Sequence, residues 1–124
     1  MVTHYVPPIT VTSQRLILDN EKLRRANAKV TTATAYKYGD LLTLSAANVL
    51  THATDESTWD VICGQDVTAA EATIKAANGI EIPMYFGGAF NIEAVSLNGT
   101  LLTTAKYDAA RAKATKNKIE LSKV

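Results

Sequence analysis

Apolar and polar residues alternate over short stretches of this chain, and a period of two residues is typical of β-strands. The stretches end at glycine, asparagine or aspartate, which are turn residues. One of them, 30–36, is rich in threonine and predicts an exposed strand. The strands predicted in this way cover residues 30–36, 41–44, 59–63, 80–86 and 119–121, and a further strand begins at 90–94 and ends before Asn98-Gly99.

The clearest of these stretches is 80–86, which lies between Asn78-Gly79 and Gly87-Gly88. We expect Ile80, Ile82, Met84 and Phe86 on one face of this strand and Glu81, Pro83 and Tyr85 on the other. Proline lacks the N–H that a central strand needs, so Pro83 predicts an edge strand or a bulge. In 59–63 the same alternation predicts that Trp59, Val61 and Cys63 share a face.

Two stretches predict helices. Thr68 and Glu71 have the spacing of a capping box, and the alanines that follow favour a helix over 69–77, although an extended loop would also fit. Residues 104–117 give the clearest prediction of a helix. An acidic residue near the start and lysines near the end match the helix dipole. Its inward stripe is predicted as Leu101, Ala105, Ala109 and Ala112.

Three further stretches are interpreted as turns or loops. Residues 20–26 fit a short helical turn or a polar loop, and Gly87-Gly88 is expected to turn the chain. His52 lies in a stretch that is interpreted as a surface loop. Taken together, these predictions describe an α+β domain that is mostly β, small and compact, with one C-terminal helix.

The N-terminal residues 1–15 are predicted to form an extended arm, followed by a single domain over residues 16–124. Pro7-Pro8 favours extended backbone and removes two N–H donors. The Ile9-Thr10-Val11-Thr12 stretch alternates apolar and hydroxyl side chains, which suits the addition of a strand to another chain. A disordered terminus is the alternative. The candidate binding residues of the arm are Tyr5, Val6, Pro7, Pro8, Ile9, Thr10, Val11 and Thr12.

Composition limits the possible partners. The chain has 124 residues, 13 basic against 12 acidic, for a net charge of +1. Nucleic-acid binding needs a clustered positive surface, so this balance argues against a direct nucleic-acid partner. No stretch has the length of a membrane span or the pattern of a signal peptide, which predicts synthesis in the cytosol and no membrane partner. The single cysteine, Cys63, lies in an apolar stretch and is expected to be buried and inert.

A search for catalytic or cofactor-binding patterns gives no strong candidate. His4 and His52 lack a second ligand at metal-binding spacing, and no glycine-rich loop has the form that binds phosphate. The carboxylates Asp40, Asp60, Asp66 and Glu81 lie beside turns or on polar strand faces, where solvation or backbone capping explains them. We therefore expect no enzyme activity, no cofactor and no metal. A small hydrolase or ligand-binding domain would need Asp60, Glu81 and His52 to meet in space.

The order of these stretches over residues 28–124 resembles the capsid decoration proteins of the phage lambda protein D type. The resemblance starts at a strand rich in threonine and alanine and ends at a charged, alanine-rich helix with a short closing strand. The proline-containing arm also fits the family. The residues that carry the resemblance are Gly39-Asp40-Leu41-Leu42, Trp59 to Cys63 with Gly64, Asp66-Val67, Tyr85-Phe86-Gly87-Gly88-Ala89-Phe90-Asn91, Thr104 to Asn117, and Ile119-Glu120-Leu121.

The resemblance implies a small β-rich, β-tulip-like domain that forms homotrimers. Such trimers bind the outer surface of the expanded phage head at three-fold and quasi-three-fold positions and stabilise it against internal DNA pressure. The implied partner is the major capsid protein, reached through the arm of residues 1–15, and the implied location is the virion, after assembly in the host cytoplasm. The alternative is another phage or bacterial structural part, such as a head-completion or tail component, for which rings of six or more copies, or filaments, would be expected in solution.

Overall fold

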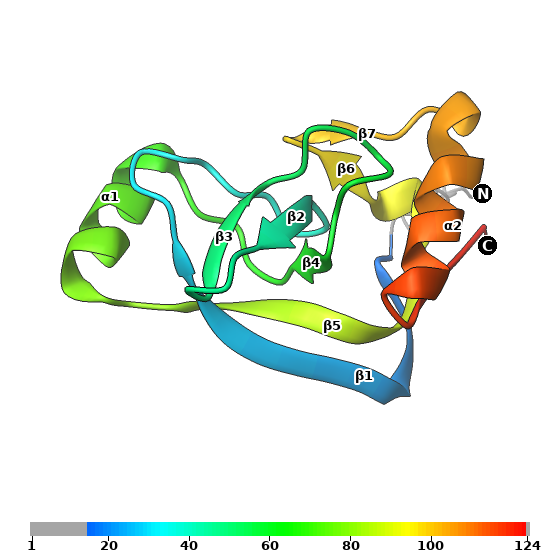
Figure 1. Cartoon of the computed structure of the whole chain (residues 1–124), viewed down its shortest axis with the longest axis horizontal. Coiled ribbons are helices and arrows are strands. Elements are labelled where there is room, and N and C mark those ends of the chain that lie inside the picture. Colours follow the sequence, from blue (N-terminus) through cyan, green and yellow to red (C-terminus); the bar gives the residue numbers. More distant parts are fainter. Residues whose placement is uncertain (1–14, 124) are drawn as a thin grey trace, which may run out of the picture.

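The computed structural model describes residues 15–123, which fold into a mostly β domain, as the sequence predicts. The two helices are α1 (Ala69–Asn78) and α2 (Tyr107–Lys116), with short 3-10 turns at Ile92–Ala94 and Thr104–Lys106. Figure 1 shows α1 and α2 at opposite ends of the domain. The strands are β1 (Ile17–Val30), β2 (Leu41–Leu44), β3 (Val49–His52), β4 (Val61–Cys63), β5 (Ile82–Asn91), β6 (Ser96–Leu97), β7 (Thr100–Leu101) and β8 (Ile119–Ser122).

Five strands pair in a closed ring. The order is β1-β3-β2-β4-β5, and β5 pairs back onto β1. The β1–β3 pairing is parallel, and the other four pairings of the ring are antiparallel. β8 adds to β5 in parallel, outside the ring, and β6 with β7 forms a separate hairpin. Closing the ring leaves no unpaired edge on its short central strands.

Alternate residues of the ring strands face two separate cores. Leu42, Val61 and Cys63 belong to a cluster with Ile82 and Met84, whereas Leu41 and Ile62 belong to a second cluster with α2 and β8. The strand period of two produces this division in β2 and β4, whose residues on both faces are buried or half-buried. Trp59 packs in the second cluster, before β4 begins, so the prediction that it shares a face with Val61 and Cys63 is wrong for Trp59.

β1 and β5 form a long two-stranded ribbon that extends beyond the ring (Figure 1). The predicted helical turn or loop at residues 20–26 is wrong, because this segment lies within β1. Its pairing with β5 is irregular. Asp19 pairs with Ala89 and Arg24 with Gly87, so more residues of β1 than of β5 lie between these two pairs.

Gly87-Gly88 lies inside β5 and does not turn the chain, which corrects the predicted turn. A Cβ at Gly88 would lie 3.3 Å from the Cα of Leu23, and Gly88 has a φ of +129°. Glycine is therefore needed here for the close approach of β1 and for the backbone conformation.

The predicted faces of residues 80–86 are only partly correct. Ile82 and Met84 are buried together, but Ile80 and Phe86 are exposed and Tyr85 is buried. Ile80 precedes β5, and Tyr85 is buried because the opposite face of β5 packs in a second cluster. Phe86 is exposed because of a bulge: Tyr85 pairs with Arg25 and Gly87 with Arg24, which leaves Phe86 unpaired between them.

β5 is also not an edge strand, since it has partners on both sides. The carbonyl of Pro83 accepts the N–H of Gly64, just past the end of β4. The nitrogen of Pro83, which carries no hydrogen, lies on the same side of the strand as this carbonyl. β4 has already ended there, so no hydrogen bond between strands is lost.

Both predicted helices are present. The capping box is complete, with Glu71 N–H donating to Thr68 Oγ1 and Thr68 N–H donating to Glu71 Oε1, and α1 ends at Gly79 in the left-handed conformation. The predicted inward stripe of the second helix is wrong: Ala110 and Ala114 are the buried residues of α2. The chain enters α2 through a 3-10 turn, which changes the phase of the helix relative to a continuous α-helix from residue 104.

Three other segments differ from the predictions. β1 ends at Val30, and residues 31–35 form a turn that leads to buried Tyr36. The strand predicted at 90–94 ends at Asn91 and continues as a 3-10 turn. His52 is the last residue of β3, where it pairs with Leu42 of β2, so it is not in a surface loop. In each case tertiary pairing decides the boundary.

No helix in the described part of the chain is long and apolar enough to cross a membrane.

Candidate functional site

The arm residues predicted to bind a partner, Tyr5 to Thr12, lie outside the described residues. The structure does show how the chain enters the domain. Arg15 is exposed, but Leu16 is buried in the core, and its carbonyl accepts the N–H of Asn91 at 2.8 Å. The first paired residue of β1, Ile17, lies beside Phe90 of β5. The residue that follows the predicted arm, its root, is therefore anchored in the core.

The last strand of the domain lies at this same place. Ser122 of β8 pairs with Asn91 of β5, the residue that also bonds to Leu16. β8 is at the end of the strand order and pairs only with β5 among the described residues. The arm root and an open strand edge thus flank the same end of β5.

A large groove runs beside this end of the domain. It has a volume of about 1420 Å³ and is lined by the irregular part of β1, the bulge of β5, β8 and one side of α2. Small-molecule pockets have volumes of roughly 300–1,000 Å³, so the groove suits a polypeptide segment better than a metabolite. Its apolar lining includes Phe86 and Leu23, and its rim carries both signs of charge, for example Glu21, Lys22 and Arg24.

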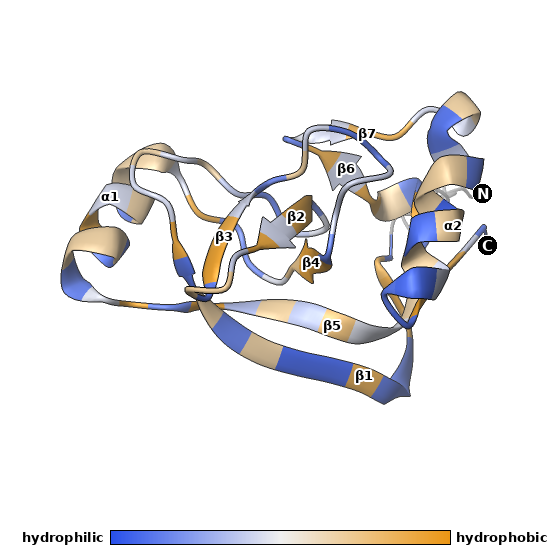
Figure 2. Ribbon diagram, in the orientation of Figure 1, coloured by the Kyte–Doolittle hydropathy of each residue, from blue (hydrophilic) through white to orange (hydrophobic). Residues whose placement is uncertain are grey.

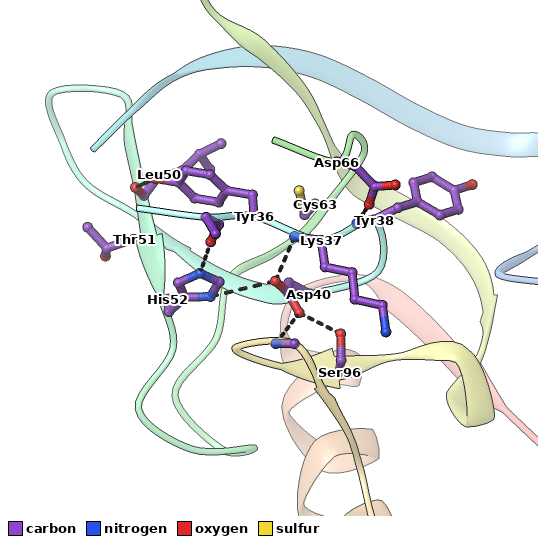
Figure 3. A network of polar contacts seen from close by, with 12 residues as sticks. Tyr36, Lys37, Tyr38, Asp40, Leu50, Thr51, His52, Cys63, Asp66 and Ser96 are labelled. Carbon is purple, nitrogen blue, oxygen red and sulfur yellow. Dashed lines mark hydrogen bonds and ion pairs between the residues drawn. The ribbon is translucent and has the colours of Figure 1, made fainter. Parts of the chain in front are cut away.

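A buried polar network lies away from the groove, centred on Asp40 just before β2 (Figure 3). Asp40 is 1% exposed. Its Oδ1 accepts Ser96 Oγ–H and, at 2.9 Å, the N–H of Gly99, and its Oδ2 accepts the N–H of Lys37 at 2.9 Å. Ser96 and Gly99 belong to the β6–β7 hairpin. Asp40 therefore joins that hairpin to the turn before β2.

His52 lies beside this network, and its side chain is only 13% exposed. Its Nε2 is 2.7 Å from the carbonyl oxygen of Ala35, so Nε2 is the protonated nitrogen. Its Nδ1 is buried and faces Asp40 Oδ2 at 3.8 Å, which is longer than a hydrogen bond. The ring also stacks on Tyr36, with centroids 5.3 Å apart. These contacts are those of a structural histidine.

The three residues that a small hydrolase would need do not act together. Asp60 Oδ2 accepts the N–H of Leu44 and Asp60 Oδ1 lies 3.7 Å from Lys113 Nζ, while Glu81 is exposed between α1 and β5. No hydrogen bond or ion pair joins Asp60, Glu81 and His52 in the part of the chain that the structure describes. Over residues 15–123, no group of three or more His, Cys, Asp or Glu side chains is placed to hold a metal ion.

Backbone capping accounts for three of the four predicted carboxylates. Asp40, Asp60 and Asp66 each accept a backbone N–H, the last from Tyr38 at 2.8 Å. That interpretation is confirmed for these three. The sequence analysis missed the partners Ser96 and Gly99 of Asp40, although the turn dipeptides at 39–40 and 98–99 mark both segments.

Cys63 is buried, as the sequence predicts, and its thiol donates to the carbonyl of Gln65. Burial raises the pKa of the Cys63 thiol to about 12, from 9.0 in an unfolded chain. Between pH 9 and about pH 12, the Cys63 thiol thus keeps its proton in the folded state and loses it in the unfolded state. The stability that depends on this thiol is complete below pH 9 and decreases as the pH rises toward 12.

We predict that Cys63 in the native protein reacts with a disulfide reagent such as DTNB at pH 8 only as fast as the protein unfolds, because the thiolate is the reactive form. Labelling in urea should be complete within the mixing time. Leu101→Cys is the matched control, since Leu101 is 44% exposed and this position should label at once in the folded protein. Rapid native labelling of Cys63 would show that the thiol is not buried in solution.

Comparison with known proteins does not identify the chain. No model of a known protein family matches the sequence, and a search of curated proteins finds no significant match.

Proposed function

We propose that this protein is a structural component of a tailed-phage capsid. Homotrimers would bind the outer surface of the expanded head at three-fold and quasi-three-fold positions and stabilise the shell against internal DNA pressure. In this proposal residues 1–15 bind the major capsid protein. The basis for the identity of the partner is the resemblance of residues 28–124 to the lambda protein D type of decoration protein.

The observation that best supports an assembly role is the anchoring of the arm root. Leu16 is buried in the core and bonded to β5, and it follows the segment of residues 9–12 that has a strand-forming pattern. A force on the arm is therefore transmitted to the folded domain through buried contacts. This arrangement suits a tether between the domain and a shell.

The energetics favour several arms acting together. Ordering one residue costs about 1–2 kcal/mol of backbone entropy, so a single arm would bind weakly. In a trimer, the second and third arms would bind at high effective concentration once the first arm is bound. A weak strand-adding contact can then give a stable attachment.

Deletion of residues 1–14 should abolish binding to the shell and leave the domain folded, because Leu16 and all described contacts remain. The probe is an expanded head assembled from the major capsid protein encoded beside this chain. Binding is measured by co-sedimentation and folding by circular dichroism. Equal sedimentation of the deleted and full-length chains would contradict the proposal.

A matched pair of full-length variants tests the strand pattern of the arm. Ile9→Lys with Val11→Lys should abolish co-sedimentation, because it places charge on the apolar face of the predicted strand. Thr10→Lys with Thr12→Lys adds the same charge on the other face and should retain most of the binding. Equal loss in both variants would show that charge, and not the strand face, controls binding.

A further inference from the structure

Among the described residues, the buried carboxylate of Asp40 has no permanently charged partner. Asp40 is 1% exposed, and it accepts its three hydrogen bonds from the Ser96 hydroxyl and from the backbone N–H groups of Lys37 and Gly99. A buried charge in a protein is normally paired with an opposite charge. The one ion pair of Asp40 within residues 15–123 is with His52, whose Nδ1 lies 3.8 Å from Oδ2. His52 can therefore compensate this carboxylate once its ring has taken up a proton.

The ring of His52 is oriented so that one nitrogen faces Asp40 (Figure 3). A carbonyl oxygen can only accept, so the contact of Nε2 with the carbonyl of Ala35 fixes the hydrogen of the neutral ring on Nε2. Nδ1 then carries a lone pair, and it is buried without a hydrogen-bond partner in the described part of the chain. The neutral ring thus sets two buried acceptors, Nδ1 and Oδ2, against each other. One proton between them would satisfy both.

No other neighbour of the pair in the described domain competes for this proton. Imidazole holds a proton more tightly than a carboxyl group, with reference pKa values of about 6.5 and 3.9, so Nδ1 is the site. Tyr36 stacks on the ring and donates its hydroxyl hydrogen to the carbonyl of Leu50, so this hydroxyl already carries a proton. Burial raises the pKa of the Cys63 thiol, which interacts with Asp40, to about 12, so the thiol is uncharged near neutral pH. Lys37 contacts Asp40 through its backbone N–H.

The strands beside β3 bring no charge to the ring. His52 pairs with Leu42 of β2, and β2 has no charged residue. On the other side of β3, Lys29 of β1 lies opposite Val49, at the far end of the strand. Figure 2 shows β2 and β4 largely in the hydrophobic part of the colour scale. Charges interact more strongly in apolar surroundings than in water, so a protonated ring and Asp40 would attract each other strongly.

We propose that His52 and Asp40 form a proton-sensitive fastening, in which protonation of Nδ1 draws the ring onto Oδ2 and ties residues 31–36 and β3 to the β6–β7 hairpin. The two atoms are 3.8 Å apart. A charge-assisted hydrogen bond is about 2.7–2.9 Å long, so a movement of roughly 1 Å closes it. The resulting chain of bonds runs from the carbonyl of Ala35 through the ring to Asp40, and from Asp40 to Ser96 and Gly99.

The fastening stabilises the domain in mildly acidic solution. Burial disfavours a charged ring, but Asp40 is already buried, so protonation replaces one uncompensated charge with a neutral pair. The unfolded chain has no such contact, and the folded state therefore binds this proton more tightly. The added stability is complete when the ring is protonated in both states, and it is lost as the pH rises until the ring is neutral in both.

Nuclear magnetic resonance of the two ring nitrogens tests the site in the unaltered full-length chain, between about pH 8 and about pH 5. His4 is the only other histidine, and His4→Gln assigns the two rings. At the higher pH, His52 should carry its hydrogen on Nε2 alone, and Nδ1 should gain a proton as the pH falls. A His52 ring that keeps one protonation state over the whole range would overturn the proposal.

Urea unfolding at about pH 7.5 and about pH 5.5 measures the effect on stability. Between these values, the unfolding equilibrium constant of the wild-type chain should fall at least about threefold further than that of His52→Gln, whose amide can donate to Ala35 but takes up no proton. His4→Gln is the matched control and should respond as the wild type does. Asp40→Asn keeps the side-chain shape and should respond as His52→Gln does. Equal responses of the wild type and His52→Gln would overturn the proposal, as would a wild-type response in Asp40→Asn.

Hydrogen exchange at Gly99 tests whether the fastening reaches the hairpin, since this N–H donates to Asp40. Its protection, corrected for the intrinsic pH dependence of exchange, should rise on acidification in the wild type and stay constant in His52→Gln. The N–H of Gly64, which donates to the carbonyl of Pro83, is the control within the same spectra and should respond less. A Gly99 amide that responds no more than Gly64 would overturn the coupling to the hairpin. The pair lies within the folded domain, so none of these experiments needs a capsid.

Discussion

Asp40→Ala is expected to lower the free energy of unfolding by about 3–5 kcal/mol, because the buried carboxylate accepts three hydrogen bonds whose donors would lose their partner. Two of these donors, Ser96 and Gly99, are 56 and 59 residues away in the sequence. The β6–β7 hairpin would thus lose its connection to the turn before β2. Most domains have a total stability of about 5–15 kcal/mol, so the variant should be close to unfolding.

Urea unfolding followed by circular dichroism measures this effect. Asp60→Ala is the matched control: Asp60 also accepts a backbone N–H, from Leu44, but its side chain is about half exposed, so water can replace the lost acceptor. We expect the control to lose less than about 1 kcal/mol. Equal losses in the two variants would show that the network at Asp40 has no special role in stability.

Gly39→Ala is expected to be the most destabilising glycine substitution, with a loss of more than about 3 kcal/mol. Gly39 has a φ of +96°, and a Cβ at this position would lie 2.6 Å from the backbone carbonyl oxygen of Ala94. Backbone cannot move aside as a flexible side chain can. The N–H of Ser96 also donates to the carbonyl of Gly39, so a shift at residue 39 would disturb the same hairpin that Asp40 holds.

Gly99→Ala separates the two causes of this effect. Gly99 has a similar φ of +85°, but nothing lies within 4 Å of a Cβ there. This variant keeps the backbone N–H that donates to Asp40, so it should lose only about 1–2 kcal/mol, the cost of the left-handed conformation for a residue with a side chain. If thermal melting gives both variants the same midpoint, backbone conformation alone accounts for the effect and the clash with Ala94 is absent.

Local patterns predicted the elements whose signals lie close together in sequence. The capping box of Thr68 and Glu71 predicted α1, since the two residues bond across a single helical turn. Short apolar stretches bounded by turn residues predicted β2 and β4, because each strand is short and buried on both faces. Backbone capping by Asp40, Asp60 and Asp66 was also correct, but only Asp40 has a local donor, Lys37, whereas the donors to Asp60 and Asp66 are 16 and 28 residues away.

Other features depended on contacts between distant segments. The bulge that exposes Phe86 arises because Tyr85 and Gly87 of β5 pair with consecutive residues of β1. The sequence of β5 alone does not indicate this pairing. The ring closes through the pairing of β1 with β3 and of β1 with β5, across many intervening residues. The phase of α2 depends on the 3-10 turn before it, so its buried residues are Ala110 and Ala114 and not the predicted stripe.

The sequence by itself determined that this protein is a mostly β domain with a C-terminal helix, and it favoured a second helix over 69–77. These properties come from periodicity and caps, which act over a few residues. The tertiary structure decided that Leu16 is buried and bonded to β5, that His52 Nε2 donates to the carbonyl of Ala35, and that a groove lies beside the bulge of β5. Each of these depends on which distant strands pair, because pairing sets both the partners of a buried polar group and the side chains left exposed.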